Sequence, residues 1–178
     1  MVIGPIMDAI AARKAGTSTV LVRNKGNRLL IQSLSVRTRL LFWLTNLPYW
    51  ALPARLATAP STLVGPAWSP LHTCCALLIA IVSSAFHGVV LFGGGSSSYE
   101  RLTKRLLVLD IAVANGYGAG LACYAGLADA AAVFAIPLLL LTWSAVAKRI
   151  GQPLTYAVGH GAWHLLSAAG LWWLLYLS

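Results

Sequence analysis

The stretch LHTCCALLIAIVSSAFHGVVLF, residues 71–92, decides the fold of this chain. It contains no Asp, Glu, Lys or Arg, and it ends at the glycine run that begins at Gly93. About 20 consecutive apolar residues are enough for a helix to cross the roughly 30 Å hydrocarbon core of a bilayer. The stretch therefore predicts a membrane-spanning helix, and this helix carries Ser83 and His87.

Three later stretches have the same character, at roughly 106–125, 129–147 and 154–177. The first two of these are separated by a very short connection, which predicts an antiparallel hairpin. The glycines within 106–125 predict close helix packing; they are Gly116, Gly118 and Gly120. The sequence thus predicts an all-α, polytopic transmembrane bundle with four spans.

A weaker candidate lies at residues 40–52, where the apolar run is interrupted by Pro48. It is short for a span. It predicts either a fifth, N-terminal crossing or a helix at the membrane interface.

The composition agrees with a membrane protein. The chain has 178 residues, of which 58% are hydrophobic and 10% are charged. Ordinary soluble domains have about 45–50% apolar and about 25% charged residues. At this length we expect one small bundle over residues 40–178, preceded by a basic N-terminal arm over residues 1–39.

The basic residues, apart from Arg55, fall in the arm and in two loops. There are 13 Lys and Arg residues against 4 acidic ones, and the loop positions fall near 101–105 and 148–149. This placement follows the positive-inside rule and points to anionic lipid head groups rather than to nucleic acid. Because both basic loops lie on one side, the arm is expected there too, which requires a crossing from region 38–60 and favours five crossings.

The arm itself fits two interpretations. It is rich in Arg and almost free of acidic residues, as organellar transit peptides are. A basic arm that lies on a membrane surface or on a partner protein has the same composition. The sequence predicts a multi-pass protein of an organellar (mitochondrial or chloroplast) or endomembrane bilayer and leaves the choice open.

Five polar residues interrupt the apolar stretches: Ser83, His87, Asp110, His160 and His164. Histidine and aspartate are costly in hydrocarbon, so they indicate a functional site by default. With a rise of 1.5 Å per residue, His87, Asp110 and His160 lie roughly 6–9 Å from the basic side, and Ser83 and His164 roughly 14–15 Å. All five are predicted to share one leaflet.

The histidine spacing predicts a metal site. His160 and His164 stand at i and i+4, so they project from one helix face and can bind one ion. His87 completes a set of three imidazoles, which leaves an open position for water on zinc. A single membrane histidine is more often a packing residue, so the hypothesis depends on the three acting together.

Asp110 and Ser83 have several open roles. Asp110 can accept a proton from the attacking water, orient a ligand imidazole or bind the metal directly. It can also simply pair with Arg105 or Lys104. Ser83 can hydrogen-bond the water or a developing oxyanion, or it can bond to a carbonyl of its own helix.

The ordered set Ser83-xxx-His87, Asp110 and His160-xxx-His164 resembles the signature of the CREST superfamily of membrane hydrolases, which includes alkaline ceramidases and adiponectin/progestin receptors. The resemblance implies zinc held by the three histidines, with Asp110 and Ser83 as catalytic residues. It also implies hydrolysis of a lipid amide or ester, with a ceramide-like substrate. Members of the family have seven helices, and this chain has room for one helix between Asp110 and His160 where they have three.

Two functions follow from these expectations. The first is a zinc-dependent integral-membrane hydrolase that acts on a membrane lipid. The second is a non-catalytic accessory subunit of a larger membrane complex, which retains a structural zinc site and contacts partner subunits. The hydrolase is the leading hypothesis, and the small size, the missing helices and the basic arm are the support for the alternative.

Overall fold

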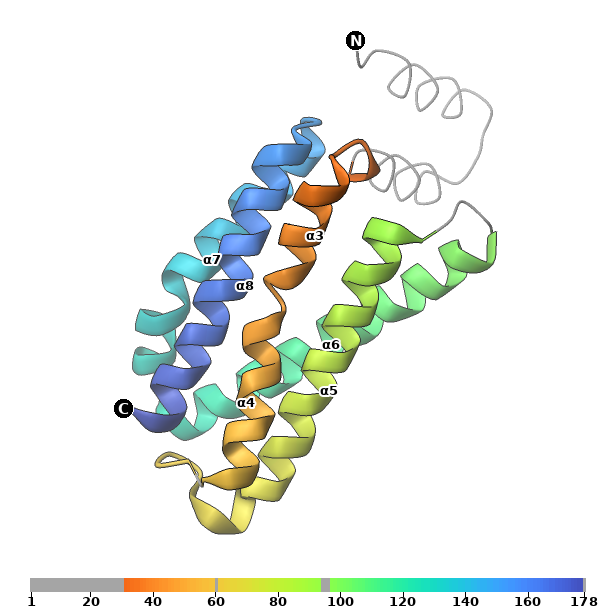
Figure 1. The fold of residues 1–178 in the computed structure, drawn as a ribbon. Coiled ribbons are helices and arrows are strands. Elements are labelled where there is room, and N and C mark those ends of the chain that lie inside the picture. The colour runs from red at the N-terminus through yellow and green to blue at the C-terminus, as the bar shows by residue number, and fades with distance from the viewer. Residues whose placement is uncertain (1–30, 60, 94–96, 178) are drawn as a thin grey trace.

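The computed structural model describes residues 31–59, 61–93 and 97–177. These residues form helices and no strands: α3 (Val36–Leu44), α4 (Leu47–Thr58), α5 (Gly65–Phe92), α6 (Ser97–Ala125), α7 (Leu127–Arg149) and α8 (Pro153–Tyr176). The helices run up and down one bundle, as Figure 1 shows. The predicted all-α fold is confirmed for this part of the chain, whereas most of the 1–39 arm lies outside the described residues.

Three helices, α5, α6 and α7, are long and apolar enough to cross a membrane. They cover the predicted spans at 71–92, 106–125 and 129–147. The fourth predicted span is also a helix, α8, of 24 residues. Its histidine, tryptophan and tyrosine side chains make the apolar stretch of α8 less apolar than those of α5, α6 and α7, so α8 is not one of the three helices that meet the apolarity expected of a membrane span. The fourth and fifth crossings therefore stay predictions.

Region 40–52 belongs to two short helices, α3 and α4, which meet at Thr45 and Asn46. Pro48 stands in the first turn of α4, where its missing N–H is tolerated. The two helices follow one another along α5 and α8, and Leu52 and Leu56 of α4 are buried in the core (Figure 1). This region therefore packs within the bundle as a broken helix.

The predicted hairpin between α6 and α7 is confirmed. Gly126 alone separates the two helices, and its φ of +92° lies in the left-handed region that favours glycine. Away from this turn the two helices separate: α6 crosses the bundle obliquely, while α7 packs along α8 (Figure 1). Because the two helices diverge, side chains from both line a cavity.

Among the described residues, the basic side chains other than Arg55 lie toward one end of the bundle. The start of α3, the end of α5, the start of α6 and the α7–α8 connection lie at this end (Figure 1). Arg39 ties two of these segments together, because its Nη1 donates to the carbonyl oxygen of Leu91 at 2.8 Å. A cation at the C-terminus of α5 also interacts favourably with the helix dipole.

The close helix packing comes from glycines other than the predicted ones. Within the chain, a Cβ atom added to Gly116, Gly118 or Gly120 would meet nothing within 4 Å, so their predicted packing role in this bundle is wrong. On α8, a Cβ atom at Gly170 would lie 2.6 Å from Val133 Cγ1 of α7. The reason is the orientation of α6: Gly116 and Gly120 are exposed on its outer side, and Gly118 faces the cavity instead of a packed helix.

Gly170→Ala is therefore expected to destabilise the protein by about 1–3 kcal/mol, because α7 and α8 must separate to admit the methyl group. Gly120→Ala is the matched control and should be neutral or slightly stabilising, since alanine is the better helix former. Thermal unfolding in detergent, followed by helical circular dichroism, measures both. Equal unfolding temperatures for the two variants would contradict the close approach of α7 and α8.

Candidate metal centre

Three histidines converge inside the bundle: His87 from α5, and His160 and His164 from α8. Their ligand nitrogens lie within 4.8 Å of one another. The ring centroids are separated by 5.3 Å for His87–His160, 4.7 Å for His87–His164 and 4.9 Å for His160–His164. His87 is 1% exposed and His164 0%. The structure thus brings together the three imidazoles that the spacing singled out.

The donor atoms of this cluster are suited to a metal ion. His87 Nε2, His164 Nδ1 and His164 Nε2 are buried without a hydrogen-bond partner among the described residues. A buried polar atom left without a partner costs about 1–3 kcal/mol, and coordination removes this cost for the one nitrogen of each ring that binds the ion. The cluster can therefore bind a metal ion. Three imidazoles suit zinc as well as copper, iron and nickel.

The orientation of His160 is set by Ser144 of α7. Ser144 Oγ donates to the Leu141 carbonyl oxygen at 2.7 Å, and it lies 3.4 Å from His160 Nδ1. Since the only hydroxyl proton is used on Leu141, Ser144 can only accept from His160. His160 then carries its proton on Nδ1, which leaves the lone pair of Nε2 for a metal.

Ser144→Ala is expected to weaken metal affinity by about 10- to 100-fold, the usual cost of losing a residue that orients a ligand. Ser69→Ala is the matched control, because Ser69 is also a buried helix serine that donates to a backbone carbonyl, that of Leu56. Competition with a chromogenic chelator measures both affinities. The same affinity in the two variants would show that Ser144 does not orient His160.

Aromatic side chains enclose the three imidazoles. Phe42 of α3 packs against all of them, with centroids 5.4 Å from His87, 5.7 Å from His160 and 6.2 Å from His164. Trp163 of α8 lies 4.7 Å from both His160 and His164. These contacts hold the rings in place. Only Trp163, which stands between the two histidines in the sequence, could have been expected there.

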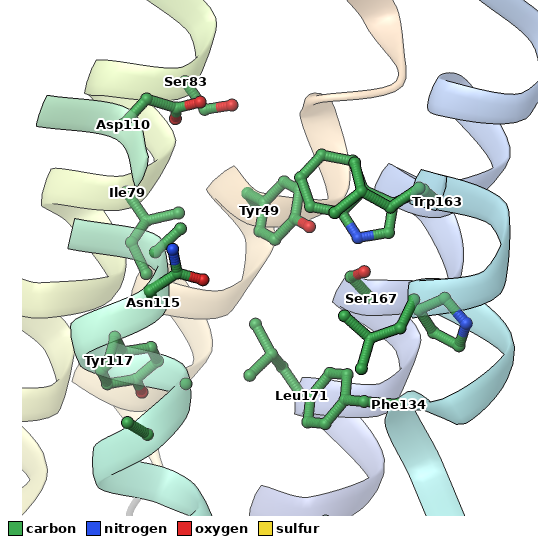
Figure 2. Close-up of a pocket in the computed structure, with 16 residues that line it drawn as sticks. Tyr49, Ile79, Ser83, Asp110, Asn115, Tyr117, Phe134, Trp163, Ser167 and Leu171 are labelled. Atoms are coloured by element: carbon green, nitrogen blue, oxygen red, sulfur yellow. The ribbon is translucent and has the colours of Figure 1, made fainter. Parts of the chain in front are cut away.

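Ser83 and Asp110 form an adjoining group. Ser83 lies one helical turn before His87 on α5, and the side chains of Ser83 and Asp110 meet across α5 and α6 (Figure 2). Both line a cavity of about 260 Å³ between α6, α7 and α8. Trp163 and Tyr49 line the same cavity and also contact His164. The cavity and the histidine cluster therefore share walls.

Asn46 is a polar site residue that the sequence reasoning missed. It is 2% exposed and lies in the break between α3 and α4. Its Oδ1 accepts a hydrogen bond from Ser83 Oγ at 3.0 Å, and its Nδ2 donates to the Trp43 carbonyl oxygen at 2.9 Å. Asn46 is also a polar residue within an apolar stretch, so the criterion that singled out the other five residues could have identified it.

No protein-family model, no curated protein and no solved structure matches this chain. The resemblance to the CREST signature therefore depends on the five residues and their order alone.

Proposed function

We propose that this protein is a zinc-dependent integral-membrane hydrolase that cleaves an amide or ester bond of a membrane lipid, with a ceramide-like lipid as the leading substrate. One observation carries the proposal: three clustered imidazoles, two of them buried with nitrogens that lack partners among the described residues, share walls with a cavity that is lined by a carboxylate. An ion held by imidazoles beside a free carboxylate is the arrangement used in metal-assisted hydrolysis.

The residues have distinct roles in this proposal. His87, His160 and His164 would hold zinc, which supplies Lewis-acid activation of water and of the substrate carbonyl. Asp110 accepts a proton from the attacking water while the oxygen of this water bonds to the carbonyl carbon of the substrate. Asp110 then returns this proton to the leaving nitrogen or oxygen as the C–N or C–O bond breaks. Ser83 helps to hold the attacking water beside Asp110.

The cavity supports a lipid substrate. Its lining comes mainly from apolar side chains of α6, α7 and α8, such as Phe134, Leu138 and Leu171. Ser83 and the carboxylate of Asp110 meet at one part of the wall (Figure 2). A hydrocarbon chain fits the apolar part, and the bond to be cleaved would lie toward the carboxylate.

The proposed topology has five crossings. To α5, α6 and α7 we add α8 and the broken helix formed by α3 and α4, which run along them (Figure 1). Alternating directions then bring the basic connections to one membrane side, as the positive-inside rule requires. A broken helix within a membrane is tolerated where protein surrounds it.

A second candidate is the accessory subunit with a structural metal site. One observation favours it: on its exposed face α6 carries Gly116 and Gly120 with open space around them, and only 11% of its membrane-spanning stretch is buried. Small residues allow close helix–helix contacts in membranes, so this surface suits a partner subunit. Under this alternative the histidines stabilise the bundle and no substrate is turned over.

The test uses the full chain, purified in detergent and analysed for metal. Zinc-loaded and chelator-treated protein are incubated with ceramide and with diacylglycerol, and released fatty acid is quantified. The hydrolase proposal expects zinc-dependent release from at least one lipid. Zinc-loaded protein that is inactive and co-purifies stoichiometrically with other membrane subunits supports the second candidate. Protein that binds no metal under any loading condition rules out both.

A further inference from the structure

The amide of Asn46 is anchored on one side by the backbone of α3. The Trp43 carbonyl oxygen accepts from both Asn46 Nδ2, at 2.9 Å, and the backbone N–H of Asn46, at 3.1 Å. Trp43 is itself tied to α5, because its Nε1 donates to the Ser84 carbonyl oxygen at 3.0 Å. The break between α3 and α4 is thus fastened to the helix that carries Ser83 and His87.

This anchor fixes which end of the amide faces Ser83. The Nδ2 end offers two donors and the Oδ1 end is an acceptor. Turning the amide around would place Oδ1 against the Trp43 carbonyl oxygen, so that two acceptors would face each other. Asn46 therefore keeps Nδ2 on Trp43 and presents Oδ1 to Ser83 Oγ, 3.0 Å away.

Ser83 lies between two acceptors. Its hydroxyl has one proton and two lone pairs, so it can donate to Asn46 or to Asp110, not to both. Asn46 is 2% exposed, and a buried acceptor without a donor is costly. Asp110 is half-buried and faces the cavity, where water can serve its oxygens. The proton of Ser83 therefore goes to Asn46, and the Ser83 lone pairs are left on the cavity side, where a water molecule can donate to both Ser83 and Asp110.

We propose that Asn46 is a positioning residue, which directs the Ser83 hydroxyl away from Asp110 and makes Ser83 a hydrogen-bond acceptor on the cavity side. The consequence for catalysis rests on the proposed hydrolase function. There, Ser83 accepts a hydrogen bond from the attacking water and holds this water beside Asp110, which takes the proton that the water gives up. Asn46 acts through Ser83 and need not touch the substrate.

The infrared band of the Asp110 carboxyl group tests the hydroxyl direction without turnover. This band is identified in the full-length protein by its loss in Asp110→Asn. In Asn46→Leu the freed Ser83 hydroxyl can donate to Asp110, so the band is expected to shift. In the Ser83→Ala background the same Asn46→Leu change should leave the band in place. Tyr49 and Tyr156, the titratable side chains that sense the Asp110 charge from α4 and α8, are unchanged in every variant.

Asn115→Leu is the matched control, because Asn115 lines the same cavity from α6. Any band shift it causes should be the same with and without Ser83. An Asp110 band that stays in place in Asn46→Leu, or that shifts equally with and without Ser83, would overturn the proposal. If Asn46→Leu does not fold, Asn46→Ala removes the same acceptor and is read in the same way.

A rate measurement separates this inference from the proposed function. Asn46→Leu is expected to lower kcat by on the order of 10- to 100-fold, with KM and zinc content unchanged, because the attacking water is misplaced. In the Ser83→Ala background the further change should have no effect on kcat. A decrease that persists there would show that Asn46 does not act through Ser83. If the wild-type protein hydrolyses no lipid, the proposed function fails, while the infrared band still decides the direction of the hydroxyl.

Discussion

His87→Ala is expected to abolish metal binding. Losing a residue that only orients a ligand costs about 10- to 100-fold in affinity, so losing one of three ligands should cost more than about 100-fold. The two histidines left on α8 form an incomplete site. Metal analysis of the purified variant should therefore give less than about a tenth of the metal per chain that the wild type binds under the same loading conditions.

His72→Ala is the control for this experiment. His72 is also a buried histidine of α5, 6% exposed, and its Nδ1 lies 3.3 Å from the Tyr117 hydroxyl, outside the cluster. Both variants lose an imidazole from the same helix, but only His87→Ala loses a ligand of the cluster. Full metal content in His87→Ala would show that the three imidazoles do not share an ion.

The same variants predict a stability difference. A ligand present at about a thousand times its Kd stabilises the folded state by about 4 kcal/mol. Chelation should therefore lower the unfolding temperature of the wild type and of His72→Ala, while the unfolding temperature of His87→Ala should not respond. A chelator effect of equal size in all three proteins would place the metal elsewhere in the chain.

Asp110→Asn is expected to reduce lipid hydrolysis by about 10²- to 10⁴-fold, the usual contribution of a general base. The amide keeps the size of the side chain and removes its ability to accept a proton. Metal content should stay at the wild-type value, because in our proposal the histidines alone hold the ion. Fatty acid release from ceramide, measured at equal zinc occupancy, gives the ratio of rates.

Asp129→Asn is the matched control, since Asp129 is exposed in the first turn of α7, at the α6–α7 connection. It should retain wild-type hydrolysis. An Asp110→Asn variant that loses its metal would instead assign Asp110 to the ligand set or to the support of a ligand. A variant that keeps both its metal and its full rate would exclude Asp110 from the reaction.

The sequence was most informative about local structure. A membrane leaves backbone groups no water to bond with, so long apolar stretches must satisfy their hydrogen bonds as helices. The predicted spans at 71–92, 106–125 and 129–147 accordingly correspond to α5, α6 and α7. The spacing of His160 and His164 also predicted their shared face, because the helix repeat fixes it. His87 was assigned to the same cluster by depth along a different helix, and the structure places it there.

Other features depend on how the helices are rotated and tilted against one another, which no local pattern encodes. The glycine pattern of α6 predicted packing, but the oblique course of α6 leaves those glycines open, and Gly159 and Gly170 of α8 make the close contacts instead. Ser144 comes to lie behind His160 only because α7 and α8 pack side by side.

The chain by itself thus determined the helices, the basic end of the bundle and the three imidazoles, because apolar runs, charge placement and the helix repeat act over a few residues or a single helix. Only the tertiary structure decided the surroundings of the imidazoles. The broken helix brings Phe42 against all three rings and Asn46 to Ser83, across 37 residues of sequence. Such contacts follow from side-chain packing between helices, which depends on every helix at once.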